Sequence, residues 1–269
     1  MIGVFDSGVG GLTVLKGFLK DHPNYDYIYL GDNANVPYGN KSSDIIYGYS
    51  TKAIDFLHEQ GCKLIIIACN SASAQALRKI QQEYLPTKYP NLKVLGVIRP
   101  IAEEVVSHKK IKKVGIIGTK ATINSNIYQE EISALNSNLE ILQKATPLLV
   151  PLIEENWLKK PETKMILKKY LRFFKMKQVE ALVLACTHYP FLLKDIKKIM
   201  GRKCLVFDTE KIISDRFFDY LNRHPELGIE KNDKAVYKFY TTDNIEKFKE
   251  LGEFFLERKI LKIEKVSLK

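Results

Sequence analysis

The sequence predicts an α/β protein of two pseudo-symmetric domains, and three observations support this fold class. Short apolar runs alternate with amphipathic segments along the 269 residues, a pattern typical of βαβ units and parallel sheets. The runs are apolar almost throughout, as strands are when helices cover both faces of a sheet. Motifs of the first hundred residues return in the same order 112 to 117 residues later. Each domain is therefore expected to contain a mainly parallel sheet flanked by helices.

The expected elements follow from these patterns. Runs rich in β-branched residues predict strands, and apolar residues three or four positions apart predict helices. Strands are expected at 2–5, 27–30, 63–68, 93–98, 113–118, 141–145, 181–185 and 204–207. Helices are expected between them, for example at 43–59, 73–84, 123–135, 161–174 and 191–200.

The composition excludes several classes of protein. A hydrophobic share of 45% and a charged share of 27% are those of a globular protein. No apolar run reaches the ~18–20 residues of a membrane span, and no signal segment precedes the first expected strand. A cytoplasmic location without a membrane partner is therefore expected. The four cysteines show no CxxC pair or zinc-ligand spacing, so we expect free thiols and no metal.

The net charge of +11 has two interpretations. One is binding of nucleic acid, and the other is a solvated, lysine-rich surface. The lysines are spread in pairs along the chain, and no nucleic-acid-binding motif frames them. The second interpretation is therefore preferred, and nucleic acid is not an expected partner.

The internal repeat matches three segments of each half. IGVFDSG (2–8) resembles VGIIGTK (114–120), and LIIIACNS (64–71) resembles LVLACTH (182–188). Between them, LGDNANVPYG (30–39) aligns with KATPLLVPLI (144–153). In open parallel sheets, ligands bind at the carboxyl ends of the strands. The active site is therefore expected in the cleft between the two domains.

Each half ends one apolar strand on a cysteine, Cys69 or Cys186, followed by polar residues. Backbone N–H groups at a helix start favour a thiolate and lower the pKa of a cysteine. Two opposed thiols suit the inversion of a tetrahedral carbon, because one removes a proton from one face while the other returns a proton to the opposite face. Packing is the alternative role, preferred for Cys62 and Cys204, which lack this polar setting.

Two further residues are candidates beside the thiols. The segment DSGVGG is neither a GxGxxG fingerprint nor a P-loop, but its glycines permit close approach of a ligand. Asp6 either caps a helix or lies near Cys69, where it would orient the thiol or accept its proton. His188 follows Cys186 by two residues and could play the matching part in the other half.

Six ordered motifs together resemble the glutamate racemase family, within the cofactor-independent aspartate/glutamate racemase superfamily. They are GVFDSGVGGLTVLK, YLGDNANVPYGNKS, ACNSASA, VGIIGTKATINSNIY, VPLIEE and ACTHYP. The resemblance covers residues 2 to about 208, and FYTTDNIEKFKELGEFFL near the carboxyl terminus also resembles the family.

The resemblance implies interconversion of L- and D-glutamate by two-base proton transfer at Cα, without a cofactor, supplying D-glutamate for peptidoglycan. It implies catalytic roles for Cys69, Cys186, Asp6, His188 and Glu154. It implies substrate contacts for Asp6, Ser7, Pro37, Tyr38, Gly39, Asn70, Ser71, Thr119, Thr122, Thr187 and His188. It also implies a homodimer, a first domain of residues 1–97 with 207–269, and a second domain of residues 98–206.

The sequence departs from the family pattern at a few positions. Ser71 stands where threonine is usual, and Ala185 replaces the glycine before the second cysteine. Arg99 lies at an expected strand end and domain junction, where it either binds a carboxylate or faces solvent. The closest alternative function is an aspartate racemase or a racemase of broad specificity. An alternative of another class is a basic protein that regulates a nucleic-acid enzyme such as gyrase.

Overall fold

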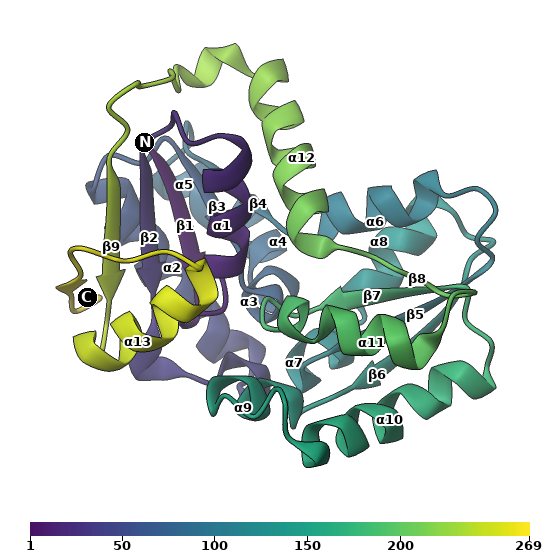
Figure 1. Cartoon of the computed structure of the whole chain (residues 1–269). Coiled ribbons are helices and arrows are strands. Elements are labelled where there is room, and N and C mark those ends of the chain that lie inside the picture. The colour runs from purple at the N-terminus through teal and green to yellow at the C-terminus, as the bar shows by residue number, and fades with distance from the viewer.

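The computed structural model describes residues 1–269 and contains two parallel sheets, each flanked by helices (Figure 1). The strand order is β10-β9-β2-β1-β3-β4 in the first sheet and β6-β5-β7-β8 in the second. Every strand pairing is parallel. The predicted α/β class is confirmed. The order β2-β1-β3-β4 recurs as β6-β5-β7-β8, so the sequence repeat corresponds to a repeat in topology.

All eight expected strands are present, with ends that differ by a few residues. The first sheet contains β1 (Ile2–Asp6), β2 (Tyr27–Gly31), β3 (Leu64–Ile67), β4 (Lys93–Gly96), β9 (Tyr237–Thr241) and β10 (Glu264–Lys265). The second contains β5 (Lys113–Gly118), β6 (Glu140–Ala145), β7 (Ala181–Ala185) and β8 (Leu205–Val206). The sequence missed β9 and β10, because β9 is only partly buried and β10 consists of two exposed, charged residues.

Thirteen α-helices surround the sheets. They are α1 (Leu12–Asp21), α2 (Ser43–Glu59), α3 (Asn70–Gln75), α4 (Leu77–Lys79), α5 (Leu85–Lys88), α6 (Ile98–Ser107), α7 (Lys120–Asn124), α8 (Ile127–Leu135), α9 (Leu149–Glu154), α10 (Pro161–Met176), α11 (Leu193–Met200), α12 (Thr209–Arg223) and α13 (Ile245–Leu256). A π-helical turn joins α4 to α5, and 3₁₀ turns occupy 33–35, 38–40, 189–192 and 225–227. No helix is both long enough and apolar enough to cross a membrane.

Three of the expected elements whose bounds differ lie at or near candidate residues. The helix expected at 73–84 begins at Asn70 and is interrupted at Ala76, where the backbone leaves helical geometry (φ −121°). The helix expected at 123–135 is two helices, because Asn126 adopts a left-handed conformation. The strand expected at 93–98 ends at Gly96, and Arg99 lies in the first turn of α6 rather than at a strand end.

The carboxyl-terminal segment packs against the first sheet. Phe18 of α1 stacks on Phe217 of α12 with ring centroids 4.7 Å apart, and Tyr29 of β2 contacts Phe248 of α13. Strand β9 pairs with β2 over its whole length. This packing supports a first domain in two chain segments, and the exact boundaries at 97 and 207 stay a prediction.

Candidate active site

A cavity of about 250 Å³ lies between the carboxyl ends of the two sheets. Its walls come from the segments that follow β1, β2 and β3 of the first sheet and β5, β6 and β7 of the second. The lining includes most of the residues expected from the sequence, namely Ser7, Pro37, Tyr38, Gly39, Cys69, Asn70, Ser71, Thr119, Glu154, Cys186, Thr187 and His188. Asp6 and Thr122 are buried and do not line the cavity.

Cys69 lies at the start of α3, on the wall formed by the first sheet. Its Sγ lies 3.5 Å from Ser7 Oγ, and only 6% of the residue is exposed. Burial and the nearby Asp6 charge raise the pKa of the Cys69 thiol to about 12. The expectation that the helix start lowers this pKa is therefore wrong, because desolvation outweighs the effect of one short helix.

Asp6 ends β1 and is fully buried beside this thiol. Its Oδ1 accepts a hydrogen bond from the Gly8 N–H at 2.9 Å, whereas Oδ2 has no hydrogen-bond partner. Helix α1 begins only at Leu12 and receives no side-chain cap, so Asp6 does not cap a helix. Burial raises the pKa of Asp6. A buried carboxylate oxygen without a partner is a free proton acceptor close to Cys69.

Cys186 lies on the opposite wall, directly after β7, in contact with His188. Its Sγ lies 3.8 Å from His188 Nδ1, and His188 Nε2 lies 2.9 Å from Glu154 Oε1 on α9. Burial lowers the pKa of His188, but its contacts with Cys186 and Glu154 outweigh burial and raise it to about 10. Burial conversely raises the pKa of Glu154, and the contact with His188 outweighs it and lowers that pKa. The second thiol therefore has an imidazolium as its neighbour.

Hydrogen bonds join the two walls beside Cys69. Ser71 Oγ lies 2.8 Å from Thr119 Oγ1, and the Tyr128 hydroxyl donates to Asn70 Oδ1 at 2.7 Å. Tyr128 lies on α8 and is fully buried. Sequence reasoning missed it as a site residue, because a buried tyrosine at helical spacing is read as core. Its bond leaves the Asn70 amide group free to donate into the cavity.

Two glycines allow the walls to approach one another. A Cβ on Gly39 would lie 2.8 Å from Thr119 Cβ, and a Cβ on Gly10 would lie 2.5 Å from His188 Cε1. Both distances are far below an ordinary carbon–carbon contact. Beside Gly39, the Tyr38 hydroxyl donates to Asp32 Oδ2 at 2.6 Å and is therefore committed within the protein.

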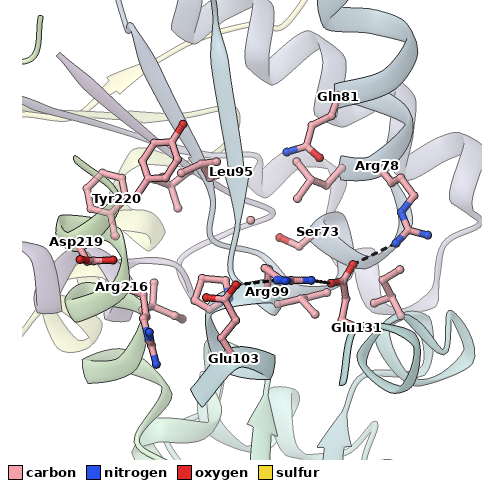
Figure 2. Close-up of a pocket in the computed structure, with 18 of the residues that line it drawn as sticks. Ser73, Arg78, Gln81, Leu95, Arg99, Glu103, Glu131, Arg216, Asp219 and Tyr220 are labelled. Carbon is pink, nitrogen blue, oxygen red and sulfur yellow. Dashed lines mark hydrogen bonds and ion pairs between the residues drawn. The ribbon is translucent and has the colours of Figure 1, made fainter. Parts of the chain in front are cut away.

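Arg99 lies outside this cavity. It lines a separate cavity of about 440 Å³ where α4, α6, α8 and α12 meet (Figure 2). Its guanidinium pairs with Glu103 Oε1 at 2.8 Å and Glu131 Oε2 at 3.0 Å, and Glu131 also pairs with Arg78. Arg99 thus binds carboxylates of its own chain, so the structure does not place it against a ligand of the cleft.

Comparison with known proteins identifies the class. The sequence profile of the Asp/Glu/Hydantoin racemase family matches residues 15–213. The chain therefore belongs to the Asp/Glu/Hydantoin racemase family, and it is an isomerase.

Several relatives within this class are glutamate racemases. The glutamate racemase of Sulfurihydrogenibium sp. is 41% identical over 99% of this chain and 97% of its own length. The solved glutamate racemase of Francisella tularensis, in complex with D-glutamate, is 37% identical with a TM-score of 0.89, covering 99% of this chain and 97% of that one. Glutamate racemase RacE1 of Bacillus anthracis is 30% identical with a TM-score of 0.92, covering 100% and 97%.

Proposed function

We propose that the protein interconverts L- and D-glutamate by proton transfer at Cα, with Cys69 and Cys186 as the two bases. One observation carries the proposal: the two thiols enter a single cavity from opposite sheets, each beside an ionisable partner. The full-length similarity to glutamate racemases supports glutamate as the substrate. The D-glutamate formed would supply peptidoglycan synthesis.

In the direction from D to L, Asp6 accepts the proton of the Cys69 thiol, and the thiolate removes the α-proton of the substrate. The Cys186 thiol returns a proton to the opposite face of the carbon. His188 reprotonates Cys186, while Glu154 stabilises its cationic form before transfer. The reverse direction uses the same groups with exchanged protonation states.

The cavity walls bind the substrate and stabilise its carbanion. The Asn70 amide group, held by Tyr128, and the hydroxyls of Ser71 and Thr187 are donors for the α-carboxylate. Donors fixed before reaction stabilise developing charge at little reorganisation cost. Ser7, Thr119 and the backbone near Gly39 are available to the side-chain carboxylate. Both thiols are 6% exposed, which limits competing proton exchange with water.

Aspartate is the closest alternative substrate. The aspartate racemase of Picrophilus torridus is 19% identical, with a TM-score of 0.55, and this likeness shows the fold alone. A difference of one methylene discriminates by about 10- to 200-fold in catalytic efficiency. We therefore expect kcat/KM to be at least ~10-fold higher on glutamate than on aspartate.

Racemisation in D₂O tests the mechanism. Product formed from either enantiomer should carry deuterium at Cα, while unreacted substrate stays protiated at early times. Cys69→Ala and Cys186→Ala should each abolish racemisation. Cys62→Ala is the matched control, because Cys62 is equally buried but lies outside the cavity, and it should remain active. Full activity in either cleft variant would exclude the two-thiol mechanism.

A further inference from the structure

The positive charge of this protein is concentrated in one segment. Residues 159–203 contain thirteen lysines and arginines and three acidic residues, so this segment carries +10 of the net charge of +11. It forms α10, β7 and α11, and the two helices pack side by side on one face of the second sheet (Figure 1). These cations therefore lie close together in the sequence and in one layer of the fold.

None of these thirteen cations forms an ion pair within the chain. Elsewhere the arginines are mostly paired, as Arg78, Arg99, Arg216 and Arg223 are with carboxylates. The uncompensated charge of the α10 and α11 layer produces a positive potential that attracts anions.

A groove of about 590 Å³ lies between the two helices. Four cations of α10 line one wall, Lys164, Lys168, Arg172 and Lys175, and Lys198 of α11 lies on the other. Spacings of four, four and three residues place the α10 cations in a row about 16 Å long. Asp195 is the single carboxylate in the lining, and the lining contains no aromatic side chain.

We propose that this groove binds the sugar–phosphate backbone of double-stranded nucleic acid without base specificity. A row of unpaired cations fits a polyanion with regularly repeated charges better than a single small anion. A hollow between two helices fits the raised backbone of a duplex better than a flat lipid surface. Single strands gain affinity by stacking bases on aromatic side chains, which this groove lacks, whereas a duplex stacks its bases internally.

Fluorescence anisotropy with a labelled 20-base-pair DNA duplex of arbitrary sequence tests the proposal. If the five groove cations contact phosphates, the affinity should fall about 500-fold between 50 and 200 mM salt. The variant Lys164→Glu/Lys168→Glu/Arg172→Glu should bind at least ~100-fold more weakly at 50 mM salt. Its slope of log affinity against log salt should fall by the amount expected for about three lost phosphate contacts.

The matched control is Lys52→Glu/Lys231→Glu/Lys234→Glu, which makes the same change in net charge at exposed, unpaired lysines outside the groove. It should retain most of the duplex affinity. Both triple variants should keep the racemase activity and thermal stability of the parent, because none of the six residues lines the active-site cavity.

Three results would overturn the proposal. They are absence of duplex binding at 50 mM salt, equal loss in both triple variants, and tighter binding to a single strand of the same length or to phosphatidylglycerol vesicles than to the duplex. Equal loss would show that net charge alone determines the affinity. Preference for the single strand or the vesicles would assign the groove to another partner.

Discussion

Each thiol of the cavity has one ionisable neighbour, and the two neighbours carry opposite charge. Cys69 lies near the buried carboxylate of Asp6, and burial together with this carboxylate raises the pKa of the thiol. Cys186 contacts the imidazolium of His188, which is stabilised by Glu154. One side of the cavity is therefore prepared to accept a proton and the other to donate one.

Replacing Asp6 by asparagine should make Cys69 more reactive and the enzyme less active. Burial, the largest cause of the raised pKa, is unchanged, whereas the repulsive charge is removed. The thiolate fraction of Cys69 at pH 8 should rise, and alkylation by iodoacetamide should be faster, as measured by mass spectrometry of the Cys69 peptide. Cys62 is the internal reference, because its pKa is raised by burial and not by Asp6. An unchanged ratio of the two rates would contradict this role of Asp6.

Replacing Glu154 by glutamine should destabilise the fold only within a pH window. The pKa of His188 is raised to about 10. The stability that protonated His188 contributes to the fold is therefore complete below pH 6.5 and is lost as pH rises through 10. The pKa of Glu154 is lowered. The stability that ionised Glu154 contributes to the fold is therefore present above pH 4.5 and is lost as pH falls. The pair therefore stabilises the fold between these limits.

Urea unfolding of this variant and the parent as a function of pH measures the window. The variant should lose about 1 kcal/mol at pH 7, a modest value because Glu154 is partly exposed, and the difference should shrink above pH 10. The neighbouring variant Glu155→Gln is the control, since Glu155 forms no ion pair, and should show no such window. A difference that is independent of pH would contradict the ion pair.

At the scale of elements, the contact of α3 with α8 holds Asn70 in place. Tyr128→Phe leaves the buried Asn70 carbonyl without its donor, which should cost about 1–3 kcal/mol in the free energy of unfolding. Asn70 should also lose its fixed orientation, so KM for glutamate should rise several-fold.

Tyr189→Phe is a matched control for this variant, because Tyr189 is equally buried and its hydroxyl bonds to Thr146 outside the cavity lining. It should lose stability to a similar extent and keep its KM. Unfolding curves and steady-state kinetics of both variants separate the two effects. Equal KM values in the two variants would show that Tyr128 supports only the fold.

The bounds of an element are predicted well from the sequence where one face of the element is buried and the other is exposed to solvent. Helix α2 was expected at 43–59 and has these bounds, because one face is buried and the other exposed. Residues 70–73 are buried on all sides between the two walls, so they carry no helical periodicity and the start of α3 was missed. Strand β9 was missed because it is only partly buried and Lys238 interrupts its apolar run.

At the scale of the whole molecule, the order of the motifs can be read from the sequence, whereas the distances between them cannot. The resemblance implies a set of site residues, and most of them line one cavity in the structure, whereas Asp6 and Thr122 are buried outside its lining. It could not predict that burial raises the pKa of Cys69, because that depends on packing from distant segments. The excess of lysines in residues 159–203 can be read from the sequence, but the groove between α10 and α11 that they line depends on how the two helices pack.

The two halves of the molecule are also joined away from the cavity, by ion pairs between α4, α6 and α8. Arg78 lies in α4, which is between β3 and β4 in the chain, and its partners Glu130 and Glu131 lie on α8 beside the second sheet. Figure 2 shows the pair between Arg78 and Glu131. Arg78 is 58% exposed, so each pair contributes at most about 1 kcal/mol. Because these pairs cross between the halves, they favour the arrangement in which Cys69 and Cys186 share one cavity.

Arg78→Met should therefore weaken substrate binding more than it weakens the fold. It keeps the apolar stem and removes the charge, and a loss of up to about 1 kcal/mol in the preference for the arrangement with a shared cavity corresponds to a rise in KM of up to about fivefold. The difference in KM between variant and parent should disappear in 1 M salt, because the salt screens the ion pairs of Arg78 that are present only in the parent. Arg223→Met is the control, because Arg223 is equally exposed but pairs with Asp219 within α12. Steady-state kinetics at 0.05 and 1 M salt compare the three proteins, and an equal KM for the two variants at low salt would show that these pairs do not influence the cavity.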